Sequence, residues 1–122
     1  MDTIQLVAQW IIGLGIFNVW FIRANRSTAY RGGDAGNIKE EFAVYGLPVW
    51  FMYVVGTLKV VLAALLILGT WIPGLVQPAA IGMAILMAGA IGMHVKVKDS
   101  IKKTLPSLAL LVLSLLVVVL SG

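Results

Sequence analysis

The 122-residue chain is 61% hydrophobic and 11% charged, with a formal net charge of +4 and a mean hydropathy of +1.02. A soluble core of this size could not bury so much apolar surface, which excludes an ordinary soluble domain and predicts a chain that lies in a lipid bilayer. The basic residues fall between apolar blocks, so we expect no nucleic-acid partner, and the lack of cysteine excludes disulfides, thiolate metal sites and iron–sulfur ligation.

The first apolar block covers about residues 4–22, which suits the roughly 20 residues needed to cross a bilayer. We expect this span to be retained rather than cleaved as a signal peptide, because its first basic residue, Arg23, follows the apolar stretch instead of preceding it. Residues from Arg23 to about Glu41 are rich in glycine and charge, which predicts a substantial loop.

The second span is expected at about residues 44–68, entered through Gly46-Leu47-Pro48 and ended by Gly69. A short uncharged turn over residues 70–74 then predicts a tight antiparallel hairpin with a third span at about 75–93. The fourth span is expected at about 104–120, with Pro106 in its first turn. The sequence thus predicts an all-α integral membrane protein, an antiparallel four-helix bundle forming a single membrane domain over residues 1–122.

The basic residues also predict an orientation. Four of them lie in the first loop and four in the third, whereas the ends and the middle loop have none: Arg23, Arg26, Arg31 and Lys39, then Lys96, Lys98, Lys102 and Lys103. Because short cytoplasmic loops are enriched in lysine and arginine, we expect both charged loops inside and both termini outside, in a bacterial-type inner membrane. Trp20 and Trp71 are then candidates for interfacial anchors.

Small residues on the third span predict a packing surface. Ala80, Ala84, Ala88 and Gly92 recur every four residues, which places them along one line of the helix. Helices in lipid associate largely through close packing at such small residues. We expect this seam to make a contact, either within the bundle or between subunits.

Lys59 is the strongest functional signal, because it lies about twelve residues, or ~18 Å, from the inner end of the second span. An ionised lysine at that depth costs about 2.5–3.5 kcal/mol or more, so it is expected to face the bundle interior. Met52, Gly56 and Ala63 share its stripe of the helix, which favours an inward face.

None of the five acidic residues lies inside an apolar block. By depth, the neutral acceptors nearest Lys59 are Ser114 on the fourth span and Gln9 on the first. Two interpretations stay open. In one, Lys59 binds an anionic or carbonyl-bearing ligand such as a quinone or a lipid headgroup, or desolvation makes it neutral. In the other, it has a structural role and binds no ligand, either bonding Ser114, Gln9 or free helix carbonyls or snorkelling toward the membrane surface.

Asn18 and His94 lie near the inner ends of the first and third spans and form a second candidate polar cluster, or are simply hydrated at the membrane surface. The candidate ligand-binding residues are therefore Lys59, Gln9, Ser114, Asn18 and His94. A single histidine cannot supply both axial ligands of a bis-histidine haem, and no carboxylate pair or histidine cluster predicts a metal site. Nothing resembles a nucleophile with its base, so we expect no catalysis by the chain alone.

Three segments resemble the DoxX-like family of small four-helix membrane proteins, with Phe17-Asn18 and Gly46-Leu47-Pro48 similar to its earlier segments. These segments are Gly56-Thr57-Leu58-Lys59-Val60-Val61-Leu62-Ala63-Ala64-Leu65, Ile72-Pro73 and Gly89-Ala90-Ile91-Gly92-Met93-His94. The resemblance singles out Lys59 and His94. It implies a role in quinone-dependent oxidation of sulfur compounds, in oxidative-stress complexes or in membrane-protein assembly.

Two functions follow as expectations. The first is an accessory subunit of a membrane redox system that binds a quinone, lipid or other ligand near Lys59, while a partner carries the electrons. The second is a non-catalytic assembly factor or chaperone that binds transmembrane segments of other membrane proteins, or self-associates, through small-residue seams. A transporter is disfavoured because the spans show neither broken helices nor an inverted repeat.

Overall fold

The computed structural model describes residues 2–22 and 36–121. In this part of the chain all regular structure is helical. The elements in order are α1 (Thr3–Phe17), the π-helical turn η1 (Asn18–Ile22), α2 (Ile38–Val44), α3 (Val49–Leu68), the 3₁₀ turn η2 (Pro73–Leu75), α4 (Val76–Lys96) and α5 (Ile101–Ser121). Arg23, Arg26 and Arg31, on which part of the orientation prediction rests, lie outside the described residues.

Four of the described helices are long and apolar enough to cross a membrane, over Thr3–Phe21, Val49–Leu68, Pro73–Lys96 and Ile101–Ser121. Each has close to the 20 residues that span about 30 Å of hydrocarbon. The predicted all-α membrane helical bundle is therefore confirmed. The chain is a multi-pass membrane protein.

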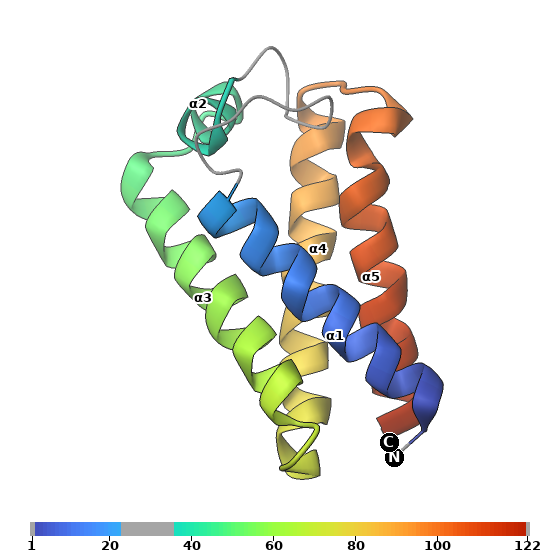
Figure 1. Cartoon of the computed structure of the whole chain (residues 1–122). Coiled ribbons are helices and arrows are strands. Elements are labelled where there is room, and N and C mark those ends of the chain that lie inside the picture. Colours follow the sequence, from blue (N-terminus) through green and yellow to red (C-terminus); the bar gives the residue numbers. More distant parts are fainter. Residues whose placement is uncertain (1, 23–35, 122) are drawn as a thin grey trace.

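The second span begins later than the sequence predicted, at Val49 instead of Val44, because the chain turns sharply between α2 and α3 (Figure 1). Gly46 adopts a positive φ of 77°. The Gly46 N–H donates to the Ala43 carbonyl and the Leu47 N–H to the Phe42 carbonyl, which is the Schellman pattern that ends α2. Pro48 then starts α3 from an extended conformation.

Two further boundaries differ. The fourth span begins at Ile101 rather than Thr104, so Pro106 lies inside α5 and not in its first turn. The end of the first span is a π-helical turn, which a count of apolar residues does not reveal. In Figure 1 the two chain ends lie together at the bottom of the bundle, while α2 and the α4–α5 connection lie at the top. We call that upper end the α2 end.

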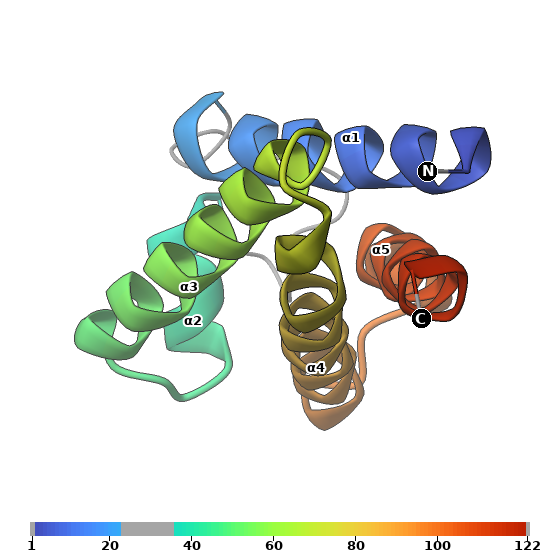
Figure 2. The ribbon, with the colours of Figure 1, turned by 90° about the horizontal axis from the view of Figure 1, so that it is seen from below.

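Helix α1 lies across the other three spans, as the view from below shows (Figure 2). The core between them is apolar and includes Ile12, Leu66, Met83 and Val117, each fully buried. Met52, Gly56 and Ala63 are buried on α3, so the predicted inward face of that helix is confirmed.

The predicted small-residue seam of α4 is buried along only half its length. Ala80 and Ala84 lie in the core, whereas Ala88 and Gly92 are exposed. The reason is geometric: four residues advance about 400° around a helix, so a line of residues spaced by four rotates by ~40° at each step. The line therefore leaves the packed face before it reaches the α2 end.

Candidate functional site

A cavity of about 770 Å³ opens among the spans at the α2 end. Its walls are mostly apolar and aromatic, with contributions from η1 and from each of the helices α1 to α5. The polar side chains in its lining are few: Asn18, Trp20, Glu41, Tyr45, Lys59, His94, Lys103 and Ser107. Apolar walls with a small number of polar groups, at a volume of about 300–1,000 Å³, are typical of small-molecule sites.

Lys59 reaches this cavity from the middle of α3, and its amine lies over the indole of Trp20, 5.9 Å from the ring centroid. Trp20 can sit there because position 56 is glycine: a Cβ on Gly56 would lie 2.7 Å from Cε3 of the indole. A cation over an indole face is stabilised by about 0.5–2 kcal/mol. The aromatic ring thus replaces part of the hydration that the amine loses.

The π-helical turn η1 positions three cavity residues, Asn18, Val19 and Trp20. A π turn holds one more residue than an α turn, so it redirects the side chains that follow. Trp20 was predicted as an interfacial anchor. The structure packs it against the core and against Phe42, with 6.3 Å between the ring centroids. Trp71, the other predicted anchor, is 68% exposed.

The sequence analysis missed Glu41, which α2 brings to the cavity that holds Lys59. Glu41 lies outside the apolar blocks, yet its carboxylate interacts favourably with the Lys59 ammonium through space. The Tyr45 hydroxyl donates a hydrogen bond to Glu41 Oε1 at 3.1 Å. The sequence analysis named only the neutral acceptors Ser114 and Gln9 near Lys59, and Glu41 adds a carboxylate to the same cavity.

A local signal for α2 was present in the sequence. Asn37 is the N-cap, and its side chain accepts a hydrogen bond from the Glu40 N–H at 2.8 Å. Glu40 in turn accepts from the Gly36 N–H at 2.6 Å. A cap residue followed three positions later by glutamate, with a glycine after the helix, is a recognised helix pattern.

His94 forms the wall of the cavity next to the α4–α5 connection and is only 4% exposed. Its Nδ1 lies 2.8 Å from Asp99 Oδ2, and Lys103 Nζ lies 3.9 Å from the other carboxylate oxygen. The Tyr45 ring meets the imidazole edge-on at 5.9 Å. His94 is thus buried in a network of polar side chains and is not a hydrated group at a helix end.

The structure places Asn18, Lys59 and His94 on one cavity, but it does not bring Gln9 or Ser114 there. Gln9 is fully buried, and its Nε2 donates to the Leu66 carbonyl at 2.8 Å while its Oε1 accepts from Gln5 Nε2 at 2.9 Å. Ser114 donates to the Leu110 carbonyl of its own helix at 2.7 Å. In the described residues neither side chain bonds Lys59, so the structural role predicted through these two residues is wrong.

The role of Gln9 follows from the end of α3. In a continuing α-helix the Thr70 N–H would donate to the Leu66 carbonyl, four residues before it. Here the Thr70 N–H donates to the Ile67 carbonyl instead. A carbonyl without a partner in a membrane costs several kcal/mol by typical transfer scales. Gln9 supplies that hydrogen bond from α1.

Comparison with known proteins gives one match. The model of the DoxX-like family covers residues 27–117, three quarters of the chain, including Glu41, Lys59 and His94. No curated protein and no solved structure matches the chain. A family model that spans α2 to α4, most of α5 and most of the cavity lining shows the relationship: this protein belongs to the DoxX-like family.

Proposed function

We propose that this protein binds a quinone in the cavity beside Lys59 and acts as an accessory membrane subunit of a redox system. The observation that carries the proposal is the Lys59 amine, placed in an apolar and aromatic cavity of about 770 Å³ at mid-span. A lysine there is costly unless it has a partner. Glu41 and Trp20 offset part of that cost, and a ligand oxygen would complete the set of partners.

The cavity lining fits the chemistry of a quinone. A quinone has a flat ring with two carbonyl oxygens and an apolar tail. Trp20, Phe42 and Phe51 provide aromatic walls, and Lys59 and the Asn18 amide provide hydrogen-bond donors for carbonyl oxygens. The redox chemistry belongs to the quinone, and the residues of this chain bind and orient it.

The electrons would be carried by a partner protein. The sequence has one histidine and no cysteine, so it offers neither bis-histidine haem ligation nor an iron–sulfur site. The proposed partner therefore holds the electron-transfer groups, and this chain supplies the membrane-side quinone site.

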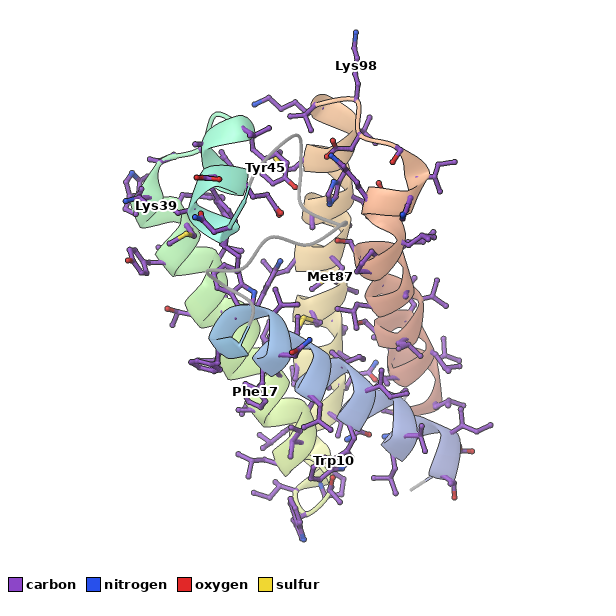
Figure 3. The ribbon with its side chains drawn as sticks, turned by 45° about the horizontal axis from the view of Figure 1, so that its top comes forward. Trp10, Phe17, Lys39, Tyr45, Met87 and Lys98 are labelled. Carbon is purple, nitrogen blue, oxygen red and sulfur yellow. The ribbon has the colours of Figure 1, made fainter. Side chains whose placement is uncertain are left out.

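The proposal places the α2 end on the cytoplasmic side of a bacterial-type inner membrane. Lys39, Lys96, Lys98 and Lys102 all lie in α2 or at the α4–α5 connection, hence at the α2 end (Figure 1). Figure 3 shows Lys39 and Lys98 projecting outward at that end. Lysine-rich short loops favour the cytoplasmic side.

Purification in mild detergent followed by extraction and mass spectrometry tests the proposal. We expect a quinone to co-purify with the wild type, and its amount to fall about 10- to 100-fold in Lys59→Met, since a hydrogen bond from a charged donor is worth about 1.5–3 kcal/mol. Lys102→Met is the matched control, because Lys102 is exposed and does not line the cavity.

The control should keep the wild-type amount of quinone. A phospholipid lost specifically from Lys59→Met would identify a lipid site instead. If neither a quinone nor a lipid depends on Lys59, the proposal is wrong.

A second function, assembly of other membrane proteins, is favoured by one observation on α4. Ala88, Gly89 and Gly92 are exposed at the α2 end, and a Cβ built on either glycine meets nothing within 4 Å. A partner helix could approach closely there. Gly92→Leu should then reduce recovery of partner membrane proteins, while Lys59→Met should leave that recovery unchanged.

A further inference from the structure

His94 is held in a fixed orientation by the turn that follows α4. Its Nδ1 lies 2.8 Å from Asp99 Oδ2, and the Asp99 N–H donates to the His94 carbonyl at 2.9 Å. Both side chains are 5% exposed. The two contacts join the same two residues, so the ring and the turn orient each other.

The Asp99 contact determines which hydrogen bonds His94 can make elsewhere. An ionised carboxylate has only acceptor atoms, so the hydrogen between it and the imidazole must be on Nδ1. A neutral imidazole has one N–H, which leaves Nε2 as an acceptor. Nε2 points away from Asp99, and His94 lines the cavity.

Lys59 has the opposite hydrogen-bonding character, because an ammonium group is a donor with no acceptor atom. The same cavity therefore presents a donor from α3 and an acceptor from α4. A quinone carbonyl can accept from Lys59 but has no hydrogen to give to His94. A hydroquinone hydroxyl can do both, as acceptor and as donor.

Building on the proposed quinone site, we infer that the cavity binds the hydroquinone form in preference to the quinone. The ligand hydroxyl donates to His94 Nε2, and Asp99 is the positioning residue that keeps Nε2 an acceptor. The other charged or hydroxyl-bearing groups of the described chain around this histidine are Lys103 beside Asp99, Tyr45 at the ring edge, and Glu41, Lys59 and Ser107 in the shared lining.

The first experiment uses the fact that His94 is the only histidine of the chain. Protein labelled with ¹⁵N in the imidazole ring, in lipid nanodiscs, gives one pair of ring signals, and their chemical shifts report which nitrogen bears the hydrogen. We expect the Nδ1–H form in the wild type and in Asp99→Asn, whose side-chain carbonyl is still an acceptor. Asp99→Leu should lose this preference. A ring in the Nε2–H form in the wild type, or one that carries hydrogen on both nitrogens at neutral pH, overturns the inference.

The second experiment measures binding of decylubiquinone and of its hydroquinone to the same samples under anaerobic conditions, by calorimetry. One additional hydrogen bond predicts about tenfold tighter binding of the hydroquinone to the wild type. Asp99→Leu and His94→Phe should bind both forms equally, and Asp99→Asn should retain the preference. Gel filtration shows whether each variant is folded, and the histidine spectrum adds a second check for the variants that keep His94.

The outcomes separate this inference from the proposed function. Equal binding of both forms by the wild type, or a preference that survives Asp99→Leu and His94→Phe, overturns the inference and leaves the quinone site standing. If neither form binds the wild type, the proposed function is wrong, and the inference is wrong with it.

Discussion

The amine of Lys59 is accommodated at mid-span by residues that lie far apart in the sequence. Trp20 covers it from η1, and Glu41 acts on it from α2. Gly56, one turn earlier on the same helix, leaves the space that the indole needs. The environment of the lysine therefore depends on the close approach of two helices at one glycine.

Substitution of that glycine tests the approach. Gly56→Ala would force its Cβ against Trp20, and overpacking costs about 1–3 kcal/mol. A gain in helix propensity of about 0.5–1 kcal/mol offsets part of this cost. The control is Gly89→Ala, because a Cβ added there meets no atom within 4 Å and only the gain in helix propensity applies.

We therefore expect Gly56→Ala to be less stable than Gly89→Ala by about 1–3 kcal/mol, in unfolding titrations with a denaturing detergent. Equal stability of the two variants would contradict the close packing of Trp20 on α3.

Gln9 makes a second residue-scale prediction. Gln9→Met removes the donor to the Leu66 carbonyl and should destabilise the protein by about 1–2 kcal/mol. Gln5→Met is the matched control on the same helix, because it leaves the bond from Gln9 to Leu66 in place. If Gln5→Met loses more stability than Gln9→Met in the same detergent titration, the hydrogen bond from Gln9 does not stabilise the end of α3.

At the scale of single residues, the sequence could predict how deep a side chain lies in the membrane and which face of its helix carries it. It could not predict which side chains on other helices it contacts. The position of Lys59 within an apolar block gave its depth, and its spacing from Met52, Gly56 and Ala63 gave its face. Gln9 and Ser114 have suitable depths, yet each faces a different neighbour. Depth along a helix axis does not specify where a side chain points around that axis once the helices cross.

At the scale of elements, α2 determines what the cavity contains at its end. The helix has seven residues, and together with its C-cap residue Tyr45 it places Glu41, Phe42 and Tyr45 in the lining. Two contacts join it to the end of α4: the Lys96 amine donates to the Tyr45 carbonyl at 2.8 Å, and the Tyr45 ring meets His94. A helix this short depends on such tertiary contacts for its stability.

Loss of the Lys96 contact should loosen α2. In Lys96→Met we expect hydrogen exchange of the α2 amides to become several-fold faster, with little change in α3. Lys102→Met, which removes an exposed lysine with no contact to α2 in the described chain, should exchange as the wild type does. Unchanged exchange in Lys96→Met would show that α2 is held by its apolar contacts alone.

The spans themselves were predictable because hydropathy and length determine them in a membrane protein. The sequence placed four apolar blocks, and four described helices coincide with them to within a few residues at most ends. The break between α2 and α3 was not predicted. By hydropathy Val44 belongs to the second apolar block, but in the structure it ends α2, and α3 begins only after Gly46 and Pro48. The π turn of η1 has no distinct sequence pattern.

At the scale of the whole molecule, the bundle is uneven along its axis. At the end that carries both termini, the spans pack around Ile12, Leu66, Val76 and Val117. At the α2 end, the cavity separates them. The polar groups of the cavity and most of the described lysines therefore lie at the same end of the protein.

The proposed orientation can be tested cleanly, because the chain has no native cysteine. Gly74→Cys and Lys98→Cys each introduce one thiol, at opposite ends of the bundle. In spheroplasts treated with a membrane-impermeant maleimide, we expect Gly74→Cys to react at once and Lys98→Cys only after permeabilisation. The reverse pattern would place the α2 end outside.

The central claim is that a quinone occupies the cavity beside Lys59. A photoreactive azidoquinone, added to the protein in nanodiscs and mapped by mass spectrometry of peptides, tests it most directly. We expect labelling of cavity segments around Asn18–Ile22, Ile38–Val44 and Met87–His94, competed by unlabelled quinone and reduced about 10- to 100-fold in Lys59→Met but not in Lys102→Met. Labelling confined to the exposed faces of α1 and α5, without competition, would contradict the claim.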